Sequence, residues 1–292
     1  MAGRLSLVGT PIGNLGDITL RAIERLKVVS RIYAEDTRRT RALLSSLGIE
    51  GKRLLSLHAH SSERAVETAV EILEGGDDVA LVTDAGMPGV SDPGFELVQK
   101  ARAQGIIIDV IPGPSAVTAS VALSGLVQNA FVFLGFLPRK GAKRKETLRR
   151  IAVSDLPTVL FESPHRMKDT LSDLALLCEP TRQVAICREL TKKYEETIVG
   201  SIADLTSDSA REEWQGEITF VVEAAREGSV AAAADEFDFD ARVKKLLQGG
   251  ASVKDTASLL VKELSRRGEK ATRKEVYGRV LSLHDQEKDS AR

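Results

Sequence analysis

Short apolar segments alternate with amphipathic segments through most of the chain, and this pattern limits the possible folds more than any other feature. Five segments are typical of strands, at residues 5–9, 31–35, 54–58, 79–84 and 106–111. Between them, the segments 19–27, 62–73 and 95–104 are typical of amphipathic helices. This alternation predicts an α/β fold with a largely parallel sheet and helices on its faces.

A second set of strand candidates follows, at residues 131–136, 158–161, 184–187, 197–200 and 218–222. We therefore expect two α/β domains, an N-terminal one over residues 1–117 and a C-terminal one over residues 118–225. Residues 226–240 are rich in alanine and acidic side chains, which indicates a linker. Residues 241–292 have an excess of Lys and Arg and helical patterns at 253–264 and 274–283. They predict a small helical appendage, either a helix-turn-helix-like element that binds nucleic acid or a cap on the body.

The composition is that of an ordinary globular protein. Of the 292 residues, 42% are hydrophobic and 28% are charged, and the formal net charge of -1 indicates no class of partner. The two cysteines, Cys178 and Cys187, have neither the spacing nor the neighbouring histidines of a metal site or a disulfide framework. The sequence shows no signal peptide and no apolar stretch of membrane-spanning length, so we expect a cytoplasmic protein.

Turn-rich loops follow four of the predicted strands, at residues 9–14, 34–38, 83–94 and 112–116. Gly, Pro, Asn and Asp suit any tight loop, so a single loop of this kind says little. Four of them at the carboxyl edge of one sheet predict a shaped cleft, because open α/β sheets bind ligands at that edge. None contains the glycine pattern of a dinucleotide-binding or P-loop protein. Ser115 is expected to cap a helix whose N-terminus can receive a carboxylate.

The loop sequences resemble those of a known family. The sequence GTPIGN at 9–14, the loop around Asp84 and the sequence PGPSA at 112–116 are similar, in order and spacing, to the cofactor loops of the tetrapyrrole (corrin/porphyrin) methylase superfamily. Within it, the stretches 34–38, 83–94, 161–166 and 188–192 resemble the ribosomal RNA small-subunit methyltransferase I family. The porphyrin branch opens with Gly-Pro-Gly-Asp where this chain has Pro-Ile-Gly-Asn, which argues against a tetrapyrrole substrate.

The resemblance implies two α/β domains with S-adenosyl-L-methionine in the cleft between them, and a homodimer. It implies 2′-O-methylation of the ribose of a cytidine in the decoding region of small-subunit (16S) ribosomal RNA. It also implies cofactor contacts at the matching positions Ile12, Asp84, Met87, Ser115, Ala116, Phe161, Glu162, Leu190 and Ile218. Two alternatives stay open. One is a methylase of the same superfamily that acts on a small molecule or a protein, and the other is a non-catalytic RNA-binding assembly factor.

Methylation of a ribose hydroxyl benefits from a nearby group that accepts the hydroxyl proton. The candidates near the predicted cleft are Glu35, Asp36, His58, Glu162, His165 and Glu189. We rank Glu35 and Glu162 first as catalytic residues, because both sit at strand ends that face the cleft. The alternative for each is a structural ion pair with a neighbouring arginine. His58 and His60 alternate at a strand end, but too few ligands accompany them, so we expect no metal.

The densest basic cluster lies between the strand at 131–136 and the helix that follows it. We predict that Arg38, Arg139, Lys140, Lys143, Arg144 and Lys145 contact RNA phosphates, and that the basic C-terminal residues extend this surface. A run of charge is more often a solvated face, but its place beside the predicted cleft favours phosphate binding. Only 4% of the residues are aromatic, which favours recognition of folded RNA or an assembled ribosomal subunit over the reading of a bare strand.

Overall fold

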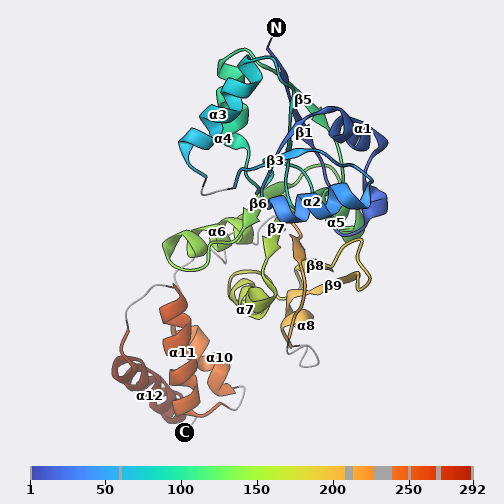
Figure 1. The fold of residues 1–292 in the computed structure, drawn as a ribbon. Coiled ribbons are helices and arrows are strands. Elements are labelled where there is room, and N and C mark those ends of the chain that lie inside the picture. The colour runs from blue at the N-terminus through green and yellow to red at the C-terminus, as the bar shows by residue number, and fades with distance from the viewer. Residues whose placement is uncertain are drawn as a thin grey trace. The chain divides into compact units, whose positions relative to one another are not determined.

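A computed structural model describes residues 2–58, 61–207, 213–226, 239–248, 251–267 and 271–290. The chain divides into two compact units (Figure 1). The first unit comprises Met1–Leu137 and Ser154–Ala224, and it holds both sheets. The second comprises Pro138–Val153 and Ala225–Arg292, and it is helical in its described part.

The first sheet is entirely parallel, as the alternation predicts. Its strands are β1 (Arg4–Val8), β2 (Arg31–Ala34), β3 (Arg53–Ser56), β4 (Val79–Val82) and β5 (Ile107–Ile111), in the order β3-β2-β4-β1-β5. The central strand β4 reads Val-Ala-Leu-Val and is buried along its whole length, because helices cover both faces of the sheet. All carboxyl ends of these strands therefore meet at one edge, where the turn-rich loops begin.

Four helices cover this sheet: α1 (Leu20–Val28), α2 (Thr37–Ser46), α3 (Glu63–Glu74) and α4 (Phe95–Ala103). The apolar faces of α3 and α4 share one core cluster with β4, through residues such as Leu73, Leu97 and Leu81. Those of α1 and α2 share the other, through Leu26 and Leu44. Short polar side chains fix the helix starts. Thr19 Oγ accepts the Ala22 N–H over 3.2 Å, and the Asp36 carboxylate accepts the Arg38 N–H over 2.8 Å.

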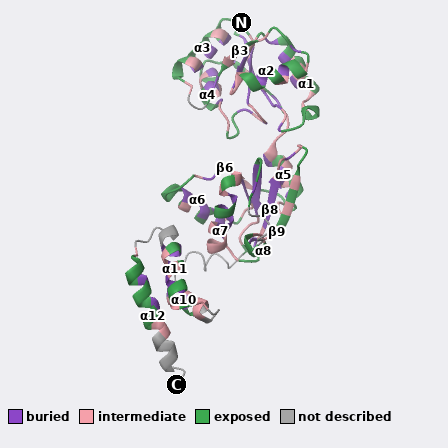
Figure 2. Cartoon of the chain, turned by 60° about the horizontal axis from the view of Figure 1, so that its bottom comes forward, coloured by how far each residue is buried: buried purple, intermediate pink, exposed green. Residues whose placement is uncertain are grey.

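The second sheet is mixed rather than parallel. Its strands are β6 (Val132–Phe136), β7 (Thr158–Glu162), β8 (Gln183–Arg188), β9 (Glu196–Ser201) and β10 (Ile218–Val222), in the order β6-β7-β10-β8-β9. Only β6 and β7 pair in parallel. The helices of this part are α5 (Ala116–Ser124), α7 (Met167–Leu177) and α8 (Ile202–Ser207), and Val117 of α5 packs against β7, β8 and β10. Figure 2 shows buried residues concentrated in the strands.

The second unit contains α6 (Ala142–Val153), α10 (Phe239–Gln248), α11 (Val253–Arg267) and α12 (Arg273–Ser290). A small core joins the last three helices through residues such as Phe239, Leu260 and Val280. A capping box starts α12: the Glu275 carboxylate accepts the Thr272 N–H over 2.8 Å, and the Thr272 hydroxyl accepts the Glu275 N–H. The C-terminal segment thus forms a small helical unit.

The expected strands and helices lie within about three residues of the observed ones, apart from the last helix, which ends later than expected. The compact units, however, divide the chain at other points than the expected domain boundaries. Both α/β parts fall in one unit, and α6 groups with the C-terminal helices. Most of the expected acidic linker, residues 227–238, lies outside the described residues. In the part of the chain that the structure describes, no helix has both the length and the apolar character needed to cross a bilayer.

Candidate functional site

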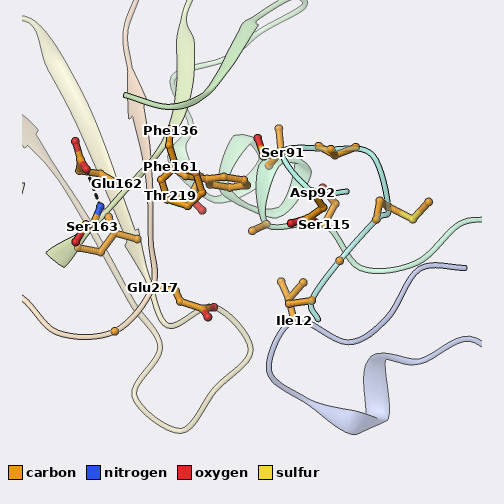
Figure 3. A pocket seen from close by; sticks show the side chains of 18 of the residues that line it. Ile12, Ser91, Asp92, Ser115, Phe136, Phe161, Glu162, Ser163, Glu217 and Thr219 are labelled. Atoms are coloured by element: carbon orange, nitrogen blue, oxygen red, sulfur yellow. Dashed lines mark hydrogen bonds between the residues drawn. The ribbon is translucent and has the colours of Figure 1, made fainter. Parts of the chain in front are cut away.

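The first unit contains a cavity of about 340 Å³, within the size range of ligand and cofactor sites (Figure 3). On one side it is lined by residues that follow strands of the parallel sheet: Ile12, Ala85, Gly86, Met87, Val90, Ser91, Asp92, Ser115, Ala116 and Val117. On the other side it is lined by the ends of three strands of the mixed sheet: Phe136, Phe161, Glu162, Ser163, Pro164, Gly216, Glu217, Ile218 and Thr219. The predicted cleft at the carboxyl edge of the parallel sheet is present.

The loops after β1, β4 and β5 pack directly on one another. A Cβ atom built on Gly113 would lie 2.9 Å from Gly9 Cα, and one built on Gly9 would lie 2.7 Å from Gly113 Cα. Two hydrogen bonds also join Thr10 to Gly86, N to O in each direction, at 2.9 and 3.1 Å. Glycine at 9 and 113 is therefore required by the close approach of two backbones. This packing places three loops of the predicted set around one cavity.

Helix α5 begins at the cavity wall. Ser115 occupies the N-cap position with extended backbone, and Ala116 and Val117 form the first turn. The Ser115 side chain makes no capping hydrogen bond, unlike the expected cap. The first N–H groups of a helix have no partners within the helix and carry partial positive charge. This end of α5 can therefore receive a carboxylate, as predicted.

Aromatic side chains form part of the opposite wall. Phe161 packs edge-on against Phe133, with ring centroids 5.1 Å apart, and it lies 5.3 Å from Phe136. Phe136 is 58% exposed although it lines the cavity. Phe161 is half-buried and packs against the core of the mixed sheet, whereas Phe136 is largely exposed; both line the cavity. An exposed ring in such a position suits stacking against a planar ligand group.

Glu162, one of the two predicted catalytic residues, is only 2% exposed. Its Oε1 pairs with Arg166 at 2.5 Å and accepts the Ser163 N–H at 2.7 Å. Its Oε2 accepts the Thr170 hydroxyl at 2.7 Å. Both carboxylate oxygens are already engaged, so the geometry favours an anchoring role for Glu162 over proton transfer. It fixes the segment after β7 that forms the cavity wall.

Glu35, the other predicted catalytic residue, is not among the residues that line the cavity. Its Oε2 accepts the Thr83 hydroxyl over 2.8 Å. Asp92 is the neighbour of this pair that does line the cavity. Burial, together with the Glu35 and Asp84 carboxylates, raises the pKa of Asp92 to about 6. Asp92 lies in the predicted loop 83–94 without a predicted role, because nothing local in the sequence distinguishes it from a turn residue.

Seven of the nine residues predicted to contact the cofactor line the cavity, all except Asp84 and Leu190. Asp84 braces a neighbouring loop: its Oδ1 accepts the Asp36 N–H over 3.0 Å, and Arg39 lies 3.4 Å from its Oδ2. Leu190 is 7% exposed and packs against Ile12, which lines the cavity. Both positions support the wall from behind. Direct contact with a cofactor stays a prediction for all nine.

A strained loop supports the wall at β10. Glu189 and Thr191 have positive φ angles of 50° and 64°. The Glu189 carboxylate accepts the Glu217 N–H over 2.9 Å and pairs with Lys192 at 2.8 Å. Non-glycine residues in this conformation store strain that the surrounding structure must offset, and they cluster at functional sites. Here the hydrogen bond to the Glu189 carboxylate fixes the backbone at 216–217, which lines the cavity.

The predicted RNA contacts are divided between the two units. Arg38 belongs to the first unit, where it pairs with Asp36 at 2.6 Å and holds the pKa of that carboxyl well below its usual range. The other five belong to the second unit: Arg139, Lys140, Lys143, Arg144 and Lys145. Arg139, Lys140 and Lys143 are exposed, whereas Arg144 is 8% exposed and donates to the Pro138 carbonyl at 3.4 Å. A buried Arg144 is poorly placed to meet a phosphate. No group of His, Cys, Asp and Glu side chains suited to a metal is present among the described residues.

Residues 4–206 match the family model of the Tetrapyrrole (Corrin/Porphyrin) Methylases. The crystal structure of the methyltransferase CobJ has the same fold, with a TM-score of 0.58 and 22% identity over 78% of this chain and 98% of that one. The chain therefore belongs to the tetrapyrrole methylases by its family match, and it has their fold. The predicted fold class is confirmed.

Curated relatives narrow the class. A Ribosomal RNA small subunit methyltransferase I from Xylella fastidiosa is 44% identical over 231 residues, which are 78% of this chain and 84% of the relative. A relative of the same name from Thermotoga maritima is 44% identical over 220 residues, which are 75% of this chain and 98% of the relative. The chain belongs to the ribosomal RNA small subunit methyltransferase I family, as the loop sequences predicted.

Proposed function

We propose that this protein is an S-adenosylmethionine-dependent methyltransferase that methylates the ribose 2′-hydroxyl of a cytidine in small-subunit ribosomal RNA. The observation that carries the proposal is the cavity, because it collects residues from three of the predicted cofactor loops at one place. The names of the relatives support RNA of the small ribosomal subunit as the acceptor. The ribose position, the cytidine, a homodimer and a cytoplasmic location are further parts of the proposal.

The residues of the cavity fit the proposed methyl donor. Ile12, Met87 and Ile218 offer apolar contacts, and the first turn of α5 offers N–H groups to a carboxylate. When bound, the donor supplies an electrophilic methyl group on a positively charged sulfur. The chain's own task is then to align the acceptor hydroxyl and to exclude water, and such alignment can supply roughly 7–11 kcal/mol of the barrier.

RNA binding requires cations that meet phosphates. The exposed side chains of Arg139, Lys140 and Lys143 are the best placed of the predicted set, because Arg144 is buried. Phe136 adds an exposed ring at the cavity, and unpaired bases stack on such rings. We propose that the three cations hold the RNA backbone and that Phe136 contacts a base near the reacting ribose.

The triple variant Arg139→Ala, Lys140→Ala and Lys143→Ala should bind small-subunit RNA more weakly than the wild type. Each lost phosphate contact should make the slope of log affinity against log salt shallower by about 0.7–0.9. The slope of the triple variant should therefore be shallower than that of the wild type by about 2–3. Filter binding across a salt series measures this slope. The matched control replaces three exposed cations of the first unit, Lys27, Arg64 and Arg102, and an equal loss of slope in that control would contradict the assignment.

The acceptor class is tested by methyl transfer from labelled S-adenosylmethionine. We expect label in the RNA of purified small subunits that lack the modification. Parallel reactions contain deproteinised RNA, a porphyrin precursor and ribosomal protein, which represent the competing acceptors. Label in the porphyrin or the protein, with none in RNA, would contradict the proposal. Donor binding without transfer to any of these acceptors would also contradict it, and would favour a non-catalytic assembly factor.

A further inference from the structure

Strand β6 contains one extra residue where it reaches the cavity. Phe133 pairs with Val159 and Phe136 pairs with Phe161, so three steps along β6 match two steps along β7. A β-bulge of this kind reverses the alternation of side chains beyond it, because successive side chains of a strand point to opposite faces. Without the extra residue, position 135 would pair with Phe161. The bulge therefore gives this place to an aromatic ring instead of to a glycine.

Gly135 lies within the bulge and packs against the loop after β4. Its φ angle is +64°, a conformation that glycine adopts freely and other residues adopt rarely. A Cβ atom built on Gly135 would lie 2.9 Å from Ser91 Oγ, so little space separates the two segments. Ser91 itself has a φ angle of +64° although it is not a glycine, and strained residues of this kind cluster at functional sites. The contact fixes the point at which Phe136 follows the bulge.

The chain is also anchored on the other side of Phe136. Leu137 is 2% exposed, and its carbonyl oxygen accepts a hydrogen bond from Arg166 Nη1 over 2.9 Å. Phe136 thus stands between two fixed points, and yet its ring is largely exposed at the cavity. A ring that is held in place before a ligand arrives loses little freedom on binding. The arrangement is that of a preformed surface for stacking.

This ring belongs to a part of the cavity that the methyl donor leaves unassigned. The cofactor contacts implied by the family resemblance do not include Phe136, Ser91 or Val90, all of which line the cavity. Figure 3 shows Phe136 and Ser91 in this lining. Val90 is 40% exposed and adds a second apolar side chain, and Ser91 adds a hydroxyl. Apolar surface beside a hydrogen-bonding group suits a nucleobase, which stacks through its faces and forms hydrogen bonds through its edge.

From this arrangement we infer that Phe136, Val90 and Ser91 form a subsite for the base of the acceptor nucleotide itself, and that Gly135 is the positioning residue that sets the ring. The inference rests on the proposed function, because it takes a ribose hydroxyl of RNA as the methyl acceptor. Base and hydroxyl belong to the same ribose, so a hydroxyl that reaches the donor brings its own base into the cavity. A cavity of this size admits one nucleotide and not a stacked helix. The acceptor nucleotide is therefore bound unstacked, with its base against Phe136.

The subsite is tested with an acceptor that has lost its base. Small subunits are reconstituted with RNA in which the nucleotide that the wild type methylates keeps its ribose but lacks its base. We expect kcat/KM of the wild type to be lower on these subunits than on normal ones by about 10-fold or more, since stacking of one base contributes at this order. In Phe136→Leu the ratio of the two values should fall by about fivefold or more, whereas Phe136→Tyr, which keeps a ring, should retain it.

Gly135→Ala tests the positioning role with the same ratio. Alanine at this φ angle strains the backbone and meets Ser91 Oγ, so the ring should move and the ratio should fall as it does in Phe136→Leu. Gly48→Ala is the matched control. Gly48 has a φ angle of +66°, a Cβ there would meet nothing within 4 Å, and the residue does not line the cavity. This control carries the same backbone strain and should keep the ratio of the wild type.

The outcomes separate the inference from the proposed function. An active wild type with the same ratio as Phe136→Leu overturns the subsite, and a raised donor Kd of that variant in calorimetry would then assign the ring to the donor. A ratio that falls in Phe136→Leu but not in Gly135→Ala, or falls equally in Gly48→Ala, overturns the positioning role of Gly135. A wild type that transfers no methyl group to RNA overturns the proposed function together with the inference.

Discussion

Replacement of Gly113 by alanine is expected to weaken S-adenosylmethionine binding by roughly 10- to 100-fold while the protein stays folded. The new Cβ would lie 2.9–3.0 Å from three backbone atoms of Gly9, closer than any real Cβ contact tolerates. Backbone atoms cannot turn aside as a flexible side chain can, so the loops after β1 and β5 must separate. Such overpacking costs about 1–3 kcal/mol, and this cost falls on the two loops that carry Ile12 and Ser115.

Calorimetry of donor binding measures this effect, and circular dichroism checks the fold. Gly278→Ala is the matched control, because it makes the same change within α12, where a Cβ meets nothing within 4 Å. The control should bind the donor as the wild type does. An unchanged donor Kd in Gly113→Ala would show that the contact of these two loops does not shape the donor site.

Replacement of Glu162 by alanine is expected to lower the free energy of unfolding by about 3 kcal/mol. The side chain is buried, and its removal takes the ion-pair partner from Arg166 and the acceptors from Thr170 and the Ser163 N–H. Loss of one partner from a buried pair typically costs about 3–5 kcal/mol, because the remaining charge stays poorly solvated. We take the lower end because the Arg166 side chain keeps 22% of its exposure. The melting temperature should fall by roughly 6–12 °C.

Differential scanning calorimetry measures that loss, with Glu162→Gln and Glu63→Ala as controls. The glutamine keeps the size of the side chain and one oxygen acceptor, so it should lose less stability than the alanine. Glu63 pairs with Lys100 at the surface with a side chain 77% exposed, and its replacement should change the melting temperature little. If Glu162→Ala had the melting temperature of the wild type and lost only activity, Glu162 would be the catalytic residue that the sequence predicted and not an anchor.

The sequence predicted the strands and the rim loops well because both depend on short-range signals. The run Val-Ala-Leu-Val of β4 is typical of a buried strand, and the loops 9–14 and 112–116 have the glycines and prolines that tight turns need. Pairing direction was harder to predict. Antiparallel pairing of β10 with β7 and β8 is decided by contacts between residues far apart in the chain, which local periodicity does not record.

Contacts between residues far apart in the chain also decide which acidic residue has which role, and the sequence pattern does not record them. Position after a strand suggested Glu35 and Glu162; of the two, Glu162 lines the cavity, whereas Glu35 accepts the Thr83 hydroxyl. It could not show that Glu162 already has Arg166, Thr170 and a backbone N–H as partners. Nor could it show that Thr83 donates to Glu35, because that hydrogen bond joins residues 48 positions apart. The burial of Arg144 within a basic run could not be predicted either, because it depends on how the chain folds around that side chain.

The proposed chemistry is tested most directly by identifying the nucleoside that gains the methyl group. Small subunits are incubated with the protein and S-adenosylmethionine, their RNA is digested to nucleosides, and the products are separated and weighed by mass spectrometry. We predict one new nucleoside, 2′-O-methylcytidine, whose fragmentation places the added methyl group on the ribose. A methyl group on a base, or on the ribose of another nucleoside, would contradict the proposed reaction.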